Sequence, residues 1–328
     1  MPLYSPQTVA NTGGFGGIEI NEMFPAVIDS RMEDVVKQDL DKVYEGLDYW
    51  QQKTTSKAYE VGSYVASGAF VPLARGIDRT LQMRSAPGFP YTVIPKERKL
   101  GISIDMLLIE TDQFGVIDQH EQDFMQAHRD TLEVECVIPF ATTFNATAPY
   151  LCPDGKRLCD SSRPNAYPEA PVWNNLETGG AVARQSISTM RVNFQKTRDD
   201  AGMLRPQVMK GVIIAPDKED TVISELGMGV KWELGSSRIP GSNFNDLNAM
   251  TKYGLEYKIW HYLTDPNAWF GYADRSDKRA WQLELYWGHK PTVTPLPMIN
   301  PRVRSYEFYA RYEYLIKASR ALRGNVGQ

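Results

Sequence analysis

The stretch TDQFGVIDQHEQDFMQAHRDTLEVECVI, residues 111–138, carries a strong helical pattern from which the rest of the chain can be arranged. Mostly apolar side chains recur every three or four residues and mark one broad face, formed by Phe114, Ile117, Phe124, Met125, His128 and Leu132. The opposite, wet side is expected at Gln119, Asp123, Asp130 and Glu133. The pattern therefore predicts a long helix with one buried face.

Strand patterns lie on both sides of this helix. Before it, Leu100, Ile102, Ile104 and Met106 alternate with Gly, Ser and Asp, which predicts a strand with one buried face. After it, a short apolar run and three alternating stretches predict strands over 211–215, 253–262, 281–287 and 306–314. Further helices are expected over 19–52, 176–197 and 218–226. This mixture of helices and strands predicts an α+β fold.

Glycine, proline and aspartate indicate where these elements end. The segment Asp199–Gly202 is expected to close the helix over 176–197. Asp265-Pro266-Asn267 predicts a turn between two strands. Six prolines within 139–171 predict a connector, and a rigid exit after the strand at 281–287 is expected from Pro291, Pro295, Pro297 and Pro301.

Two segments have too little apolar sequence to fold alone. Residues 1–20 are rich in Gly and polar residues, which predicts an extended arm or a disordered tail. Between Gly62 and Pro95 the chain is rich in Gly and Pro, which predicts a two-stranded excursion with Arg75, Asp78, Arg79 and Arg84 at its tip. Because such long loops are uncommon inside compact domains, the excursion is either disordered or reaches for another molecule.

The charge distribution is uneven although the total is small. The chain is 42% hydrophobic and 23% charged, with a net charge of −4, and so lacks the basic excess of a protein that neutralises many phosphates. Residues 29–48 carry seven acids and three bases, whereas residues 300–328 carry six bases and two acids. These two stretches are either solvated or complementary partners, within one subunit or between subunits.

No motif indicates catalysis or metal binding. The sequence has no G-x-S-x-G, no H-E-x-x-H and no phosphate loop, and His120, His128, His261 and His289 are dispersed. A triad assembled only by the fold stays open. Free thiols are expected for Cys136, Cys152 and Cys159, with no nearby partners to complete a zinc site. We therefore expect no enzyme, with no catalytic, cofactor-binding or metal-binding residue.

Targeting and membrane signals are also missing from the sequence. Its start, MPLYSPQTVANTGG, has neither a basic nor an apolar leader region, and no apolar run reaches the roughly 20 residues of a membrane span. We expect a protein made in the cytosol with no membrane partner. The 7 Trp, 17 Tyr and 12 Phe residues fit core packing, and some would suit an interface.

Several short stretches follow one another in an order that resembles a known family. Phe144-Asn145 is followed by Asp154-Gly155-Lys156-Arg157-Leu158-Cys159 and Ser161-Ser162, with Arg163-Pro164 where the family often has His-Pro. Then come DDAG at 199–202 with GVIIAP at 211–216, and YLTDPNAWF at 262–270. Over about residues 15–325 the chain resembles the major capsid proteins of tailed bacteriophages, which have the Hong Kong 97 (HK97) fold.

This resemblance implies a division of the chain into six parts. They are an N-terminal arm (1–28), a peripheral-domain helix (29–55), an extended β-hairpin loop with peripheral strands (56–110), a spine helix (111–138), a β-rich axial domain with a Pro-rich crossover (139–298), and a C-terminal peripheral strand and tail (299–328). Long arms and loops bury little surface in a monomer, so they are expected to become ordered on a neighbouring subunit.

The function implied by the resemblance is structural. Copies would self-assemble into the hexamers and pentamers of an icosahedral head that encloses double-stranded DNA, a virion capsid assembled in the host bacterial cytoplasm. The implied partners are further copies, a portal protein, decoration and separate scaffolding proteins, and DNA bound without sequence reading. Register between subunits would come from the acidic helix and from Arg75, Arg79 and Arg84 or Arg320 and Arg323. An encapsulin-like cellular compartment and a soluble α+β hydrolase are the alternatives.

Overall fold

The computed structural model describes residues 45–57, 59–64, 88–105, 116–145, 149–166, 170–177, 179–200, 202–226, 253–277, 280–297 and 303–327. The expected arm over 1–28, most of the acidic helix, and Arg75, Asp78, Arg79 and Arg84 lie outside these residues. Within the described part, none of the helices has the length and apolar character of a membrane span.

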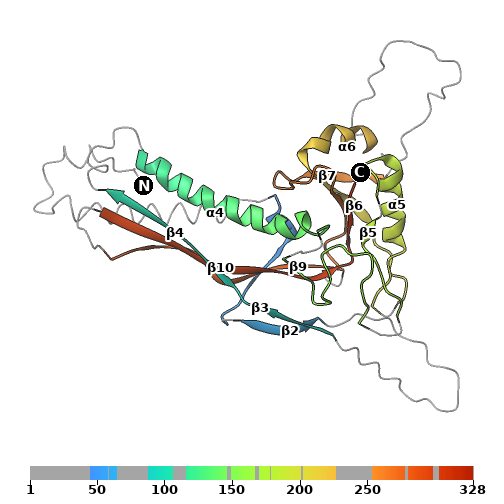
Figure 1. Ribbon diagram of the computed structural model, residues 1–328, viewed down its shortest axis with the longest axis horizontal. Helices are drawn as coiled ribbons and strands as arrows, with labels where there is room; N and C mark the ends of the chain where they lie inside the picture. Colours follow the sequence, from blue (N-terminus) through green and yellow to red (C-terminus); the bar gives the residue numbers. More distant parts are fainter. Residues whose placement is uncertain are drawn as a thin grey trace, which may run out of the picture.

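A four-stranded sheet forms the long half of the molecule (Figure 1). Its order is β1 (Gln51–Thr54), β9 (Trp281–Pro295), β10 (Val303–Ser319) and β4 (Lys96–Asp105), and β10 runs antiparallel to both of its neighbours. The alternation predicted for the last strand is confirmed, because one face of β10 is buried at Tyr306, Phe308, Ala310, Tyr312 and Tyr314.

The helix α4 (Val116–Ala141) lies along this sheet. The ring of Phe308 on β10 packs against Phe124 and His128, with ring centroids 5.9 and 4.4 Å apart. Nearer the end of α4, the Tyr314 hydroxyl donates to the Leu132 carbonyl at 3.0 Å. The buried face predicted from Phe124, Met125, His128 and Leu132 is therefore confirmed.

A five-stranded sheet forms the other half. Its order is β5 (Leu176–Glu177), β11 (Leu322–Asn325), β8 (Trp269–Ala273), β6 (Met209–Ile214) and β7 (Glu256–Ile259). The helices α5 (Arg184–Gln195) and α6 (Glu219–Leu226), with the short 3-10 helix η2 (Pro216–Lys218), belong to this half. The apolar run over 211–215 forms the last four residues of β6 and the residue after it, and it is buried, as the sequence predicts.

The predicted two-stranded excursion begins as a short antiparallel pair. β2 (Glu60–Tyr64) pairs with β3 (Phe89–Val93), and Gly62 lies opposite Tyr91. A Cβ built on Gly62 would come within 2.4 Å of the Tyr91 hydroxyl, so a larger residue there would push the Tyr91 ring aside. The pair confirms the base of the excursion.

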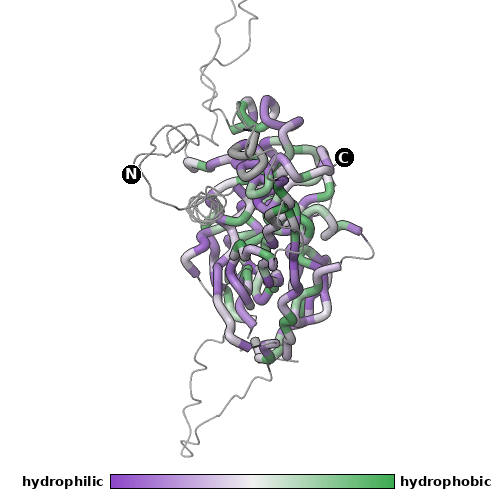
Figure 2. The backbone as a smooth tube through the Cα atoms, turned by 90° about the vertical axis from the view of Figure 1, so that its left-hand side faces the viewer, coloured by the Kyte–Doolittle hydropathy of each residue, from purple (hydrophilic) through white to green (hydrophobic). Residues whose placement is uncertain are grey.

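One continuous hydrophobic core joins the two halves. Its residues come from α4 and from strands of both sheets, and Figure 2 shows hydrophobic segments running through the body. Phe140, in the last turn of α4, packs against Trp50, Trp260 and Phe270, with ring centroids 6.4, 4.7 and 5.4 Å apart. The halves therefore meet around one aromatic cluster and do not form separate cores.

Three helix predictions need correction. The helix expected over 19–52 does not reach residue 52, because Leu47–Tyr49 form a 3-10 helix (η1) and the next residues form β1. The helix expected over 176–197 begins only at Arg184, since Leu176–Glu177 form β5. Asp199–Gly202 form a separate turn after α5, in which the Gly202 N–H donates to the Asp199 carbonyl.

The long helix α4 departs from its prediction at two places. It continues through Pro139 to Ala141, beyond the end expected at 138. A proline near a helix end removes only one hydrogen bond, so the last turn can still form. Glu133, expected on the wet side, is buried, and its carboxylate accepts a hydrogen bond from the Gly46 N–H at 2.9 Å.

The strands also differ in length from the predictions. The strand expected over 253–262 is only β7, whereas β9 runs on through Pro291 and Pro295, which were expected to form an exit. On one edge of β9, β1 pairs only with residues 284–287. Pro291 and Pro295 therefore lie where this edge has no described partner strand, a position in which proline is tolerated. The turn predicted at Asp265–Asn267 is confirmed by the Asn267 N–H, which donates to the Asp265 carboxylate at 2.9 Å.

The two sheets do not follow the expected domain ranges. β9, expected in the axial range 139–298, belongs to the four-stranded sheet, and β11, expected in a tail over 299–328, lies inside the five-stranded sheet. The basic end of the chain is therefore part of the fold, at least as far as Asn325.

Candidate functional site

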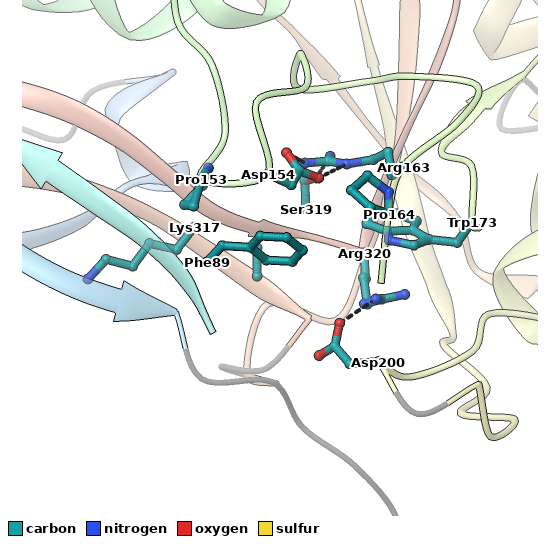
Figure 3. Close-up of a pocket in the computed structure, with 11 residues that line it drawn as sticks. Phe89, Pro153, Asp154, Arg163, Pro164, Trp173, Asp200, Lys317, Ser319 and Arg320 are labelled. Atoms are coloured by element: carbon teal, nitrogen blue, oxygen red, sulfur yellow. Dashed lines mark hydrogen bonds and ion pairs between the residues drawn. The ribbon is translucent and has the colours of Figure 1, made fainter. Parts of the chain in front are cut away.

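The junction between the two sheets is a cluster of buried charges. β10 ends at Ser319 in one sheet and β11 begins at Leu322 in the other, so Arg320 and Ala321 alone connect them. Figure 3 shows the side chains that converge here from the 153–173 segment, the turn at Asp200 and the end of β10. Side-chain contacts at this short connection add to the hydrophobic core in holding the two sheets together.

Arg163 forms the first half of this cluster. Its guanidinium makes a bidentate ion pair with Asp154, through Nε–Oδ2 at 2.9 Å and Nη2–Oδ1 at 3.1 Å. Nη1 donates to the Leu158 carbonyl at 3.1 Å and to the hydroxyl of Ser319. Only 2% of Arg163 is exposed. The residue thus ties the 154–163 loop to the last residue of β10.

Arg320 forms the second half, on the other side of Trp173. It binds Asp200 at 2.5 Å and Asn165 at 2.6 Å through Nη2, and donates to the Arg198 carbonyl at 2.9 Å through Nη1. The guanidinium carbons of Arg320 and Arg163 lie 4.2 and 4.8 Å from the Trp173 ring. Cation–π contacts of this kind gain strength when they are removed from water.

Asn175 and Arg323 extend the junction into the five-stranded sheet. The Asn175 amide donates to the Leu158 carbonyl at 2.8 Å, and its carbonyl oxygen accepts from the Asp160 N–H at 2.9 Å. Arg323 on β11 pairs with Glu177 on β5 at 2.9 Å and donates to the Asn193 carbonyl at 3.1 Å. Arg323 thus holds β11 against β5 and α5, and Asn175 fixes the 158–160 segment beside them.

The cavity within the junction is too small for an organic ligand. It measures about 20 Å³, which is room for about one water molecule. Removing one partner of a buried, hydrogen-bonded ion pair costs about 3–5 kcal/mol, because the other charge is left without compensation. We conclude that this cluster sets the geometry of the molecule.

A second buried charge cluster lies at the root of the β2–β3 pair. Glu284 on β9 is 0% exposed and binds Lys53 of β1 and Lys317 of β10, each at 2.5 Å, while the Tyr286 hydroxyl donates to it at 2.7 Å. Burial alone would raise the pKa of Glu284, but hydrogen bonds from these three groups outweigh burial and lower it. Lys317 also lies 4.3 Å from the centroid of the Tyr91 ring on β3.

The residues singled out from the sequence do not form one site. His128 is buried against Phe308, His261 is exposed and contacts Glu45 at 2.9 Å, and His289 is exposed beside Tyr309. The side chain of His120 lies outside the described residues, as do Arg75, Arg79 and Arg84. Among the described residues there is no group of three His, Cys, Asp or Glu side chains that could hold a metal ion.

The cysteines and the basic end of the chain have structural surroundings. Cys136, Cys152 and Cys159 are free and buried, and burial raises the pKa of the Cys159 thiol to about 12. Arg320 and Arg323, expected to pair between subunits, are instead 7% exposed each and pair with Asp200 and Glu177 of the same chain. The prediction that Arg320 and Arg323 pair between subunits is therefore wrong, because both ion pairs lie within one chain.

Sequence reasoning missed Arg163 and Glu284 for different reasons. Arg163 was noticed only as a replacement for histidine, although the Asp154-Gly155 turn nearby offered it a carboxylate. Glu284 lies within the alternating pattern that predicts a strand over 281–287, but both faces of β9 are covered over these residues. A charged residue inside an otherwise aromatic run, WQLELYW, was the signal that could have identified it.

Comparisons with known proteins find similarity in structure only. No protein-family model and no curated protein matches the sequence. A structure from Microbacterium phage Oxtober96 has a TM-score of 0.50 and 10% identity, covering 88% of this chain and 95% of its own. The procapsid of bacteriophage JBD30 has a TM-score of 0.49 and 12% identity, covering 94% of this chain and 75% of its own. A virus-like particle from Pyrococcus furiosus has a TM-score of 0.47 and 8% identity, covering 91% of this chain and 99% of its own.

At such low identity, the similarity concerns the fold alone. The Oxtober96 match extends over most of both chains, so the similarity is not limited to one part of the molecule. The chain therefore has the HK97-like fold.

Proposed function

We propose that this protein is the subunit of a self-assembling shell, the major capsid protein of a tailed bacteriophage. The observation that carries the proposal is the shape of the fold. An elongated sheet with its helix joins a second sheet through a rigid charged junction, and a two-stranded excursion leaves the body near that junction (Figure 1). Such a molecule suits repeated head-to-tail contacts, which close into rings.

Exposed apolar side chains support contacts between copies. On and beside the β2–β3 pair, Tyr59, Val61 and Ile94 are each about 60% exposed. A second set, near the turn after α5, comprises Val172, Met203, Leu204 and Val208. Exposed apolar groups of this kind that gather on one face commonly mark interaction sites. We infer that both sets are covered in the assembled shell.

The parts of the chain receive roles on this proposal. Residues 1–28 would be the arm, 56–100 the loop that overlaps a neighbour, and the four-stranded sheet with α4 the peripheral domain with its spine helix. The five-stranded sheet would form the axial domain, with its tip near the centre of each hexamer or pentamer. The arm and the part of the loop beyond the β2–β3 pair would make their contacts on neighbouring subunits in the assembly.

The partners follow from the same proposal. They are further copies of the chain, a portal protein, decoration and separate scaffolding proteins, and packaged double-stranded DNA contacted without sequence reading. The net charge of −4 suits a container that does not hold DNA tightly at every point. The protein would be located in the virion, after assembly in the host bacterial cytoplasm.

The test is direct observation of assembly. We expect the purified chain, alone or with its scaffolding protein, to give hexamers, pentamers or hollow shells in light scattering and negative-stain images. Shells that protect DNA from nuclease would support the capsid, whereas shells filled with a cellular enzyme would favour an encapsulin-like compartment. A compact monomer with an ordered, protease-resistant 62–98 segment would contradict both and return attention to a hydrolase.

The matched variant replaces residues 65–87 with a short Gly-Ser linker and keeps β2 and β3. Because these residues would lie on a neighbouring subunit, we expect a folded, soluble subunit that does not close shells. A control variant keeps the full length of residues 65–87 but scrambles their order. It separates the loss of specific contacts from the loss of length. Intact shells from the shortened variant would contradict the role given to the loop.

A further inference from the structure

A groove beside the junction carries uncompensated positive charge. Its volume is about 330 Å³, and four cations line it: Lys196, Arg198, Arg320 and Arg323. No carboxylate is among its lining residues; Ser161, Thr197 and Asn174 contribute the other polar groups. The groove is open on one side and lies between the end of α5 and the segment around Trp173.

The four cations fall into two pairs. Arg320 and Arg323 form the buried floor, and each is matched by one carboxylate of the same chain. Lys196 and Arg198 are exposed, and neither forms an ion pair with a described carboxylate. Arg198 donates to the Gly202 carbonyl at 2.8 Å, which fixes its guanidinium without neutralising it. The groove therefore keeps about two positive charges.

The rim of the groove is apolar. Val172 is 67% exposed at one edge, and Met203 and Leu204 follow the turn that faces it. The two segments are adjacent, because a Cβ built on Gly202 would come within 3.3 Å of the Pro171 ring. A ligand for this surface needs carboxylates for Lys196 and Arg198 and aliphatic side chains for the rim.

We propose that this groove binds residues 29–44 of a second copy of the chain. That stretch has five acids and three bases, a net charge of −2, with Met32, Val35, Val36, Leu40 and Val43 among them. Its charge thus matches the two uncompensated cations, and its aliphatic residues match the rim. Glu45 and Asp48 are not included, because they already contact His261 and Arg275 of their own chain.

The inference rests on the proposed function, since a second copy is needed, and it adds where one copy holds the next. Charge complementarity of this kind fixes register and orientation more than it adds affinity. The acidic stretch would therefore decide which neighbouring arrangement forms, while the exposed apolar side chains supply most of the buried surface. The fold alone does not imply this pairing.

The first experiment identifies the groove's neighbour chemically. Equal amounts of unlabelled and ¹⁵N-labelled chain are mixed and allowed to assemble. A carbodiimide then joins amines directly to neighbouring carboxylates, and the linked peptides are identified by mass spectrometry. We expect Lys196 to be joined to a carboxylate within 29–44, with mixed-isotope pairs showing that the two peptides come from different chains.

Other outcomes overturn the proposal in distinguishable ways. Links from Lys196 to 29–44 without mixed-isotope pairs would mean that the stretch binds its own chain. Assembled shells in which Lys196 is joined only to other carboxylates, or to none, would mean that the groove has another neighbour. If the wild-type chain forms no assembly under any condition, the proposed function fails before the groove is tested.

Charge reversal provides an independent test. The double variant Lys196→Glu, Arg198→Glu should lower the yield of shells about tenfold, and adding Asp39→Lys and Asp41→Lys in the same chain should restore it. The matched control, Lys258→Glu with Lys290→Glu, changes the net charge equally at exposed positions outside the groove. Equal losses in both double variants, or no restoration, would contradict the pairing.

Discussion

At the scale of single residues, two buried charged side chains hold together segments that the hydrophobic core alone would not orient. Arg163 and Glu284 are almost completely removed from water, and each is surrounded by partners from segments that lie far apart in the sequence. Their value is specificity of geometry, because a buried ion pair is weakly stabilising overall yet strongly destabilising when broken.

Arg163→Met tests the junction. The substitution keeps an unbranched side chain but leaves Asp154 buried without its ion-pair partner, so we expect a loss of about 3–5 kcal/mol in the free energy of unfolding. Urea unfolding measures it. Adding Asp154→Asn should recover part of the loss, and two independent, additive losses would show that the pair does not act as a unit.

His128 makes stability depend on pH. Burial lowers its pKa from 6.5 to about 4, so between these values the unfolded chain binds a proton that the folded chain does not. The free energy of unfolding should therefore decrease as the pH is lowered through this window, by about 2 kcal/mol between about pH 6.5 and about pH 5. His128→Leu should remove this part of the dependence, and identical slopes in both proteins would contradict it.

At the scale of elements, sequence periodicity predicted those helices and strands whose apolar residues follow a regular spacing. The buried face of α4, the strand β10 and the apolar run of β6 were all found from spacing, because each presents a single face or is buried throughout. The early start of the helix at 176 was wrong because Leu176–Glu177 pair with Gly324 and Asn325 of β11, which are distant in sequence. The local sequence around residue 176 does not reveal a pairing with a strand so distant in the chain.

The same reasoning explains the other errors. β9 continues through two prolines because one of its edges has no described partner beyond residue 287, so no hydrogen bond is lost there. Glu133 is buried because Gly46, which is distant in sequence, donates to its carboxylate. The junction residues could not be predicted, since Arg163, Asp200 and Ser319 become neighbours only after both sheets have formed.

The attachment of the β2–β3 pair to the body can be tested at Tyr91. This residue faces Gly62 and lies over Lys317, beside the small cluster of Val93, Tyr286 and Leu315. Tyr91→Ala should raise amide hydrogen exchange in both strands about tenfold or more, because local opening becomes easier. The exposed Val61→Ala is the control; equal exchange in the two variants would show that Tyr91 does not anchor the pair.

At the scale of the whole molecule, β11 completes the fold. It lies between β5 and β8, and it carries Arg323, which pairs with Glu177. A chain that stops after Ser319 loses this strand and also leaves Asp200 and Glu177 without their guanidinium partners. We expect it to be insoluble or to lose cooperative thermal unfolding.

A chain that stops after Asn325 provides the comparison. It retains β11 and both arginines, so its melting temperature should stay within a few degrees of the full chain. If the shorter chain unfolds just as cooperatively as this one, the strand is dispensable and the junction does not depend on it.

The central position of β11 also has a consequence during protein synthesis. The five-stranded sheet cannot close until residues 322–325 have left the ribosome, although most of its strands emerge much earlier. The four-stranded sheet depends in the same way on β10 (Val303–Ser319), so a nascent chain would keep both sheets open until these late strands have been made. If the protein assembles as proposed, incomplete chains on neighbouring ribosomes would lack a finished surface on which to associate, and association would wait until β11 has formed.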